Sequence, residues 1–138
     1  MEITPAGTGP GQKEHGLCGL ILWQDTDNYI TINIWVHEVY GGASISCFFQ
    51  LDGFEDLYDA IWSNVGKRAY YNVPMTLRVV CDGTNYAVFV GEEPVLFRAL
   101  TDVYPNYGTF SIQQVGLLAN WEWGNDTGST FRNFVGRI

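Results

Sequence analysis

The chain has 138 residues, of which 46% are hydrophobic and 15% aromatic, and its formal net charge is −8. This length fits one domain and leaves no room for a second, catalytic one, and the apolar content excludes intrinsic disorder. Seven scattered cations against fifteen acidic residues exclude a nucleic-acid or anionic membrane surface as partner. No apolar run approaches the roughly 20 residues of a membrane-spanning helix.

Residues 1–15 are predicted to form a flexible leader, because Gly and Pro dominate residues 5–11. Pro10 removes one of the backbone amides that a glycine-rich phosphate loop needs, so nucleotide binding is not indicated. The folded domain is therefore expected to span residues 16–138.

Three cysteines, Cys18, Cys47 and Cys81, lie in separate apolar stretches without the spacing of a zinc or redox motif. We expect buried thiols, because cysteine is among the most frequently buried residue types. Their odd number argues against a disulfide-stapled secreted domain.

From Leu17 onward, short apolar runs alternate with turn signals at the spacing of a β-sandwich. In the clearest run, Asn28–Val36, Ile or Val at every second position predicts one face in the core. Similar runs are Leu17–Trp23, Ala43–Leu51, Thr76–Asp82, Tyr86–Val90, Val95–Leu100, Phe110–Trp121 and Thr130–Val135. The predicted fold class is an all-β, antiparallel β-sandwich.

One segment has the spacing of a helix. The residues at three- and four-residue intervals are Phe54, Leu57, Tyr58, Ile61 and Trp62. Asp52 suits the N-cap of such a helix. A short helix around residues 54–63 and a strand with an irregular hairpin both remain open from the residues alone.

Four pieces of sequence follow one another in a recognisable order: Gly19–Trp23 with Asp25–Tyr29; Leu77–Gly83; Val90–Leu96; and Val115–Leu118 before Phe131–Phe134. This order resembles the concanavalin A-like lectin/glucanase superfamily. That superfamily includes laminin-G-like modules and the non-catalytic modules appended to bacterial glycoside hydrolases. The resemblance covers about residues 17–138 and implies a jelly-roll sandwich.

Modules of that superfamily usually carry further N-terminal strands before the segment that matches Gly19. Either the leader supplies an edge strand, or the chain is the C-terminal part of a larger module that a preceding segment completes. Because missing strands leave unpaired sheet edges, we expect the chain to dimerise or to pair with another chain through such an edge.

The densest polar and aromatic cluster lies between two predicted strands and comprises Trp121, Glu122, Trp123, Asn125 and Asp126. Trp rings stack on sugar C–H faces, and the neighbouring oxygens hydrogen-bond hydroxyls, so this composition suits a carbohydrate site. The competing interpretation is a turn in which a Trp fills the core. The two alternatives remain open.

A second candidate binding surface is the polar side of the strand at residues 28–36, with Asn33 and Trp35 and, on a neighbouring strand, Arg78. If this side lies on a concave sheet, an exposed Trp beside Asn and Arg suits sugar recognition. On a convex sheet it is ordinary solvated surface.

The turn Asp25, Asp27 and Asn28 offers hard oxygen ligands of the type that Ca²⁺ prefers. The resemblance adds weight, since many members of that superfamily bind calcium. A plain Asx turn is the more common use of such residues. Calcium is thus a possible ligand, and no cofactor is required.

Catalytic residues are not indicated. The glucanases of the superfamily carry an alternating Glu-x-Asp-x-x-Glu run on one strand, and this chain has no such run. A Gly-x-Ser-x-Gly elbow is also missing from the sequence. Activity of the chain on its own is therefore not expected, although its status as an enzyme stays open.

The sequence predicts a non-catalytic, lectin-like carbohydrate-binding or accessory module whose partner is a glycan or polysaccharide. A catalytic domain or a second chain is a further expected partner. The alternatives are the C-terminal structural part of a glycoside hydrolase and a protein-interaction sandwich. Such a module is extracytoplasmic if it belongs to a larger carbohydrate-active protein and cytoplasmic otherwise.

Overall fold

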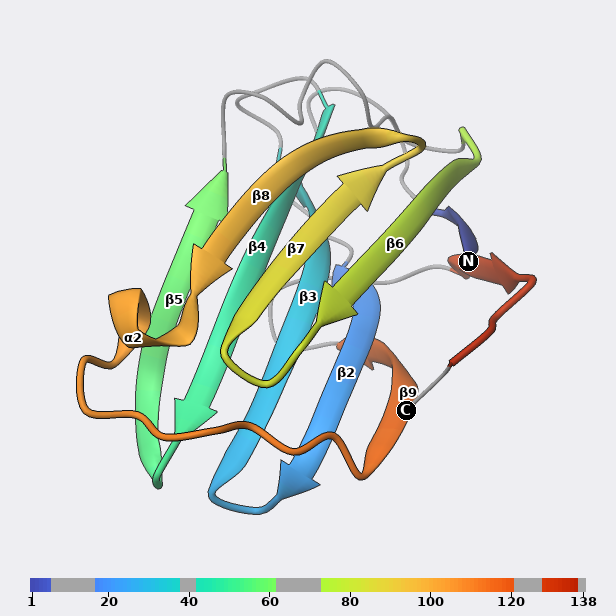
Figure 1. The fold of residues 1–138 in the computed structure, drawn as a ribbon. Coiled ribbons are helices and arrows are strands. Elements are labelled where there is room, and N and C mark those ends of the chain that lie inside the picture. The colour runs from blue at the N-terminus through green and yellow to red at the C-terminus, as the bar shows by residue number, and fades with distance from the viewer. Residues whose placement is uncertain (6–16, 38–41, 62–72, 121–127, 137–138) are drawn as a thin grey trace.

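The computed structural model describes residues 1–5, 17–37, 42–61, 73–120 and 128–136, in which two five-stranded antiparallel sheets pack face to face (Figure 1). The front sheet has the strand order β10-β1-β6-β7-β8 and the back sheet the order β5-β4-β3-β2-β9. The front strands are β1 (Glu2–Thr4), β6 (Met75–Cys81), β7 (Asn85–Val90), β8 (Glu93–Ala99) and β10 (Thr130–Arg132). The back strands are β2 (Leu17–Asp25), β3 (Asn28–His37), β4 (Gly42–Leu51), β5 (Phe54–Ile61) and β9 (Gln114–Asn120), and a short helix, α2 (Leu100–Val103), follows β8.

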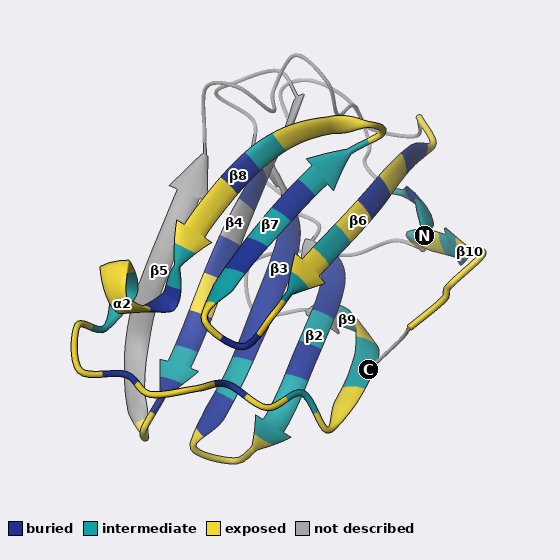
Figure 2. Cartoon of the chain, in the orientation of Figure 1, coloured by how far each residue is buried: buried dark blue, intermediate teal, exposed yellow. Residues whose placement is uncertain are grey.

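The core lies between the two sheets, as the buried positions on facing strands show (Figure 2). Ile30, Ile32 and Ile34 of β3 are fully buried, which confirms the alternation read from the sequence. From the front sheet, Tyr86 contacts Phe49 of β4 with ring centroids 5.3 Å apart. The predicted all-β sandwich is therefore confirmed.

Residues 54–61 form strand β5, so the helix considered around residues 54–63 is wrong for the part that the structure describes. Asp52 and Gly53 have φ angles of 51° and 77° and form a two-residue hairpin turn between β4 and β5. An Asp-Gly pair is well suited to such a turn, because both central residues need positive φ. Pairing with β4 satisfies the backbone groups on one side of β5 and outweighs the helical spacing of its apolar residues.

The predicted leader contains a strand at its start. Strand β1 lies between β10 and β6, Ile3 is fully buried, and the amino group of Met1 donates to the carbonyl oxygen of Leu77 at 3.1 Å. Of the two alternatives for the N-terminus, the one in which the leader supplies a strand therefore fits residues 2–4. The strand lies inside the sheet, between β10 and β6, rather than at its edge. Residues 6–16 lie outside the described part.

The last long predicted strand, Phe110–Trp121, begins only at Gln114. Before it, Phe110 is buried and its N–H donates to the carbonyl oxygen of Gly83 at 2.8 Å. Residues 104–113 thus cross from α2 to β9 without joining a sheet, along the lower end of the sandwich (Figure 1).

The three cysteines behave as expected from their apolar surroundings. Cys18 and Cys47 are fully buried, Cys81 is half-buried, and no disulfide joins them. Burial raises the pKa of the Cys81 thiol. Across the described residues, no helix has the length and apolar character needed to cross a membrane.

Candidate functional site

The outer face of the back sheet, which points away from the viewer in Figure 1, carries rows of aromatic and polar residues. Directly opposed residues of neighbouring strands share a face, so the register defines these rows. The first row is Gln114, Trp23, Tyr29 and Gln50; the second is Gly116, Ile21, Thr31 and Phe48; the third is Leu118, Gly19, Asn33 and Ser46. We call these three rows the outer face.

The first row contains a fixed aromatic pair. The rings of Trp23 and Tyr29 stack with centroids 5.5 Å apart and 14° between their planes, and both residues are half-buried. The carbonyl oxygen of Trp23 also accepts a hydrogen bond from the N–H of Gln113 at 2.8 Å. Both the ring plane and the backbone of Trp23 are therefore held in place before any ligand arrives.

One amide side chain lies on each side of the aromatic pair: Gln114 is next to Trp23, and Gln50 is next to Tyr29. Gln114 is exposed and Gln50 is half-buried. Among the described residues, neither side-chain amide has a hydrogen-bond partner. The row therefore offers donors and acceptors to a ligand that contacts the rings.

Asn33, in the third row, is only 1% exposed although it belongs to the outer face. Its Nδ2 donates to Thr31 Oγ1 at 3.0 Å, and its Oδ1 has no partner in the described part of the chain. A buried amide with one unpaired end lowers the stability of the folded state by about 1–3 kcal/mol, and Asn33 is such a residue.

Two of the predicted binding residues fall on this face or beside it. Asn33 is one, and Trp35 follows in β3, where its backbone pairs with Leu17 and Ser44. The structure describes only the backbone of Trp35.

Arg78 does not join them, so its expected place on a neighbouring strand is wrong. It lies in β6 of the front sheet, and its guanidinium carbon is 4.1 Å from the centroid of the Phe89 ring on β7. The alternation of β6 turns Arg78 outward, away from the core and from the back sheet.

The largest predicted cluster, Trp121, Glu122, Trp123, Asn125 and Asp126, lies outside the described residues. Its place in the fold is given only by its neighbours, since it connects β9 to β10. Binding by this cluster stays a prediction.

The expected calcium turn is occupied by hydrogen bonds. Asp25 Oδ1 accepts from the N–H of Asp27 at 2.9 Å and from Asn28 Nδ2 at 3.0 Å, and the Asn28 bond is the main reason that the pKa of Asp25 is lowered. Asn28 Oδ1 accepts from the N–H of Asp52 and from the hydroxyl of Tyr107, both at 2.9 Å.

These oxygens are thus directed at N–H and O–H donors rather than at a shared point. The described residues also contain no group of three or more His, Cys, Asp or Glu side chains that could hold a metal ion. Asp25 and Asn28 thus form a hydrogen-bonded turn, and calcium binding by Asp25, Asp27 and Asn28 stays a prediction.

Three residues of the first row were not predicted as binding residues from the sequence: Trp23, Gln50 and Gln114. Each belongs to a predicted strand, so alternation alone could have assigned each to one of two faces. Assembling them into one row needs the register between four strands, which a single strand pattern does not contain.

The chain matches no family in a scan of protein-family models, and a search of curated proteins finds no match.

Proposed function

We propose that this protein is a non-catalytic, lectin-like module that binds a glycan on the outer face of the back sheet. The observation that carries the proposal is the first row, in which a stacked Trp23–Tyr29 pair lies between Gln114 and Gln50. The concanavalin A-like jelly roll suggested by the sequence is part of the same proposal.

The chemistry of this row matches that of a sugar. Pyranose rings have apolar C–H faces and a rim of hydroxyls, so they bind where aromatic rings lie beside amide groups. The mutual stacking of Trp23 and Tyr29 restricts both side chains, and this lowers the entropy lost when a ligand binds.

Binding without catalysis is supported by the chemistry of the described face. Glycoside hydrolysis needs two carboxyl groups on either side of the scissile bond. The side chains described on the outer face are aromatic, aliphatic, hydroxyl or amide groups. They are suited to holding a sugar rather than to transferring a proton.

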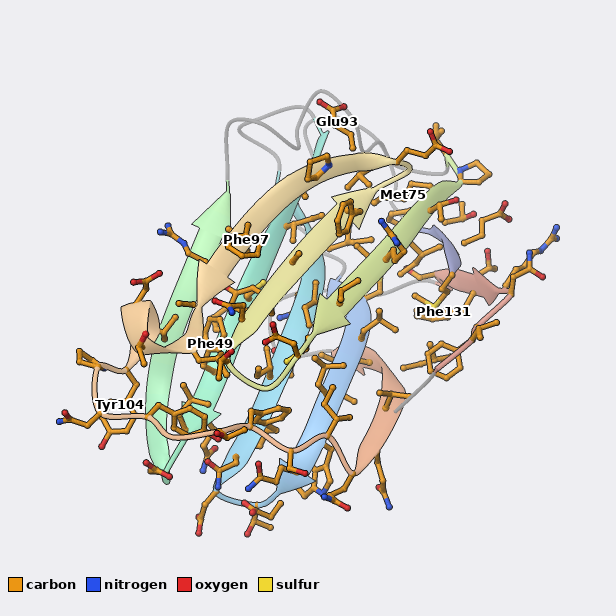
Figure 3. The ribbon with its side chains drawn as sticks, viewed as in Figure 1. Phe49, Met75, Glu93, Phe97, Tyr104 and Phe131 are labelled. Atoms are coloured by element: carbon orange, nitrogen blue, oxygen red, sulfur yellow. The ribbon has the colours of Figure 1, made fainter. Side chains whose placement is uncertain are left out.

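A second candidate role, as a protein-interaction or accessory sandwich, is favoured by the front sheet. Phe97 on β8 is 71% exposed (Figure 3). Val80 on β6 of the same sheet, which lies opposite the outer face, is 48% exposed. Exposed apolar residues on one sheet face are typical of a surface that contacts another protein. A catalytic neighbour would be one such partner.

The test is affinity electrophoresis of the intact chain against a panel of soluble polysaccharides, with Ca²⁺ and with chelator. We expect retardation by at least one polysaccharide in both conditions. Trp23→Ala should weaken that binding about tenfold or more. Thermal unfolding of each variant separates lost binding from lost structure.

Phe97→Ala is the matched control, because it removes an exposed aromatic ring from the other sheet. It should leave the affinity unchanged. Trp123→Ala tests the 121–126 cluster: if it abolishes binding while Trp23→Ala does not, the outer face is not the site. A folded chain that no polysaccharide retards would contradict the glycan-binding proposal itself.

A further inference from the structure

The solvent-facing side of the front sheet carries a row of apolar residues. The strand register puts Val80, Ala87 and Phe97 side by side on β6, β7 and β8. Val80 and Phe97 are exposed, and Ala87 between them is half-buried. No other described segment crosses in front of these three strands, so the row is open to a partner (Figure 1). We call this row, together with the neighbouring Arg78 and Phe89, the front patch.

Arg78 and Phe89 form the second row of the front patch. They oppose each other on β6 and β7, and the guanidinium carbon of Arg78 is 4.1 Å from the centroid of the Phe89 ring. The Arg78 side chain is exposed, and no carboxylate of the described residues pairs with it. The ring therefore holds the planar guanidinium in place while its N–H donors stay available to a ligand.

The two rows together define the chemistry of a complementary partner. A guanidinium binds a carboxylate through two parallel N–H donors, and an arginine that is already oriented loses less entropy when it does so. Exposed aromatic residues and arginine are also the residue types enriched in protein interfaces. A partner therefore fits the front patch when it places a carboxylate at Arg78 and an apolar group on the adjacent row.

We propose that the front patch docks a short segment of a partner protein in which a large apolar residue lies near an acidic one. The apolar side chain lies over Ala87, whose methyl group leaves room between Val80 and Phe97, and the carboxylate binds Arg78. Ala87 and Arg78 are diagonal neighbours, roughly 7–8 Å apart. Residues three or four positions apart on a helix, or two apart on a strand, provide about this spacing.

This inference rests on the second candidate role, protein interaction, and names the chemistry of the partner. It does not depend on glycan binding by the outer face, which belongs to the other sheet. The front patch is small beside the roughly 20–30 residues that a standard interface uses on each side. We therefore expect it to bind a short segment with micromolar affinity.

The experiment is selection of a random peptide library on the immobilised full chain, followed by fluorescence anisotropy with the enriched peptides. We expect these peptides to share an acidic residue roughly two to four positions from a large apolar one. Their affinity should fall as salt is added, because the charges are exposed. Arg78→Gln should weaken binding about tenfold or more, and so should Ala87→Leu, which fills the room above β7.

A change in the peptide tests the contact from the other side. Replacing its acidic residue by the corresponding amide should weaken binding to the wild-type chain about tenfold. The same replacement should have no effect on binding to Arg78→Gln, because the partner of the carboxylate is already missing. Independent, additive losses would overturn the assigned contact between the carboxylate and Arg78.

Arg132→Gln is the matched control, because Arg132 is an exposed cation of the same sheet on β10, outside the front patch. It should leave the affinity unchanged, and thermal unfolding verifies that each variant is folded. Peptide binding that survives both Arg78→Gln and Ala87→Leu would overturn the front patch as the docking site and leave a protein-interaction role intact. A library without enriched peptides would contradict that role as well. Displacement of the peptide by a uronic-acid oligosaccharide that Arg78→Gln no longer binds would make the patch a glycan site and overturn the protein partner.

Discussion

Single polar residues in this fold hold turns by accepting several hydrogen bonds. Asp82 Oδ1 accepts from the N–H of Asn85 at 2.7 Å, the N–H of Thr84 at 2.9 Å and the hydroxyl of Thr84 at 3.1 Å. These bonds, the one from Asn85 first, lower the pKa of Asp82 to about 2. They favour the ionised carboxyl, because each donor stabilises negative charge.

The pH dependence of stability follows from this shift. The pKa of Asp82 is lower in the folded chain than in the unfolded chain, so its contribution is complete above the usual carboxyl pKa of 3.8 and is lost as the pH falls toward 2. We predict that Asp82→Asn lowers the melting temperature at neutral pH. The difference from the wild type should shrink between pH 4 and pH 2.

Thermal unfolding over this pH range measures the effect. Glu92→Gln is the control, because Glu92 lies exposed in the turn before β8 and accepts no hydrogen bond within the described part of the chain. A constant difference between wild type and Asp82→Asn at every pH would show that the charge of Asp82 is not what stabilises the turn.

At the scale of elements, the approach of β2 to β3 depends on one glycine. A Cβ atom at Gly19 would collide with the carbonyl oxygen of Ile32 and lie 3.0 Å from the Cα atom of Asn33. Backbone atoms cannot rotate away, so a side chain there separates the two strands. Gly116 on β9 differs, since its Cβ would meet only the Cγ2 atom of Ile21 at 3.2 Å.

We therefore predict that Gly19→Ala lowers the free energy of unfolding by about 1–3 kcal/mol or more, as overpacking in a core does. Gly116→Ala should change it by less than about 1 kcal/mol, because the end of the Ile21 side chain can move. Urea unfolding of both variants provides the comparison. Equal losses for the two glycines would mean that β2 and β3 tolerate separation.

At the scale of the whole molecule, the two sheets leave the edges β10, β8, β5 and β9. Strand β8 carries Pro94 and two charged residues, and its pairing with β7 shifts register at Phe89. Prolines, charges and irregular register discourage edge-to-edge pairing. Strand β9 contains neither proline nor a charged residue, and its Leu117 is 46% exposed.

Self-association should therefore proceed through β9 rather than β8. We predict that light scattering over a concentration series shows a mass rising toward that of a dimer. Leu117→Lys should return the chain to the monomer, and Phe97→Lys on β8 should not. A monomeric mass at all concentrations would contradict this prediction.

The strands themselves could be predicted from the sequence, because burial of one strand face imposes a period of two on apolar residues. The run from Asn28 to Val36 and the core positions Ile30, Ile32 and Ile34 follow from that pattern alone. The Asp52–Gly53 turn was also readable and would have favoured strand β5 over a helix. Asn33 was placed correctly on the face opposite the core.

The assembly of the candidate site was decided only by the tertiary structure. A plain two-residue turn at residues 26–27 would pair Gln24 with Tyr29, but the register shift between Trp23 and Asp25 places Trp23 there instead. A slip of one residue exchanges the two faces of a strand, so this irregularity alone turns Trp23 toward Tyr29. Which strands share a sheet is likewise a long-range property, and it separates Arg78 from Asn33. Local sequence determines which residues alternate, whereas the packing of distant strands determines which of them meet.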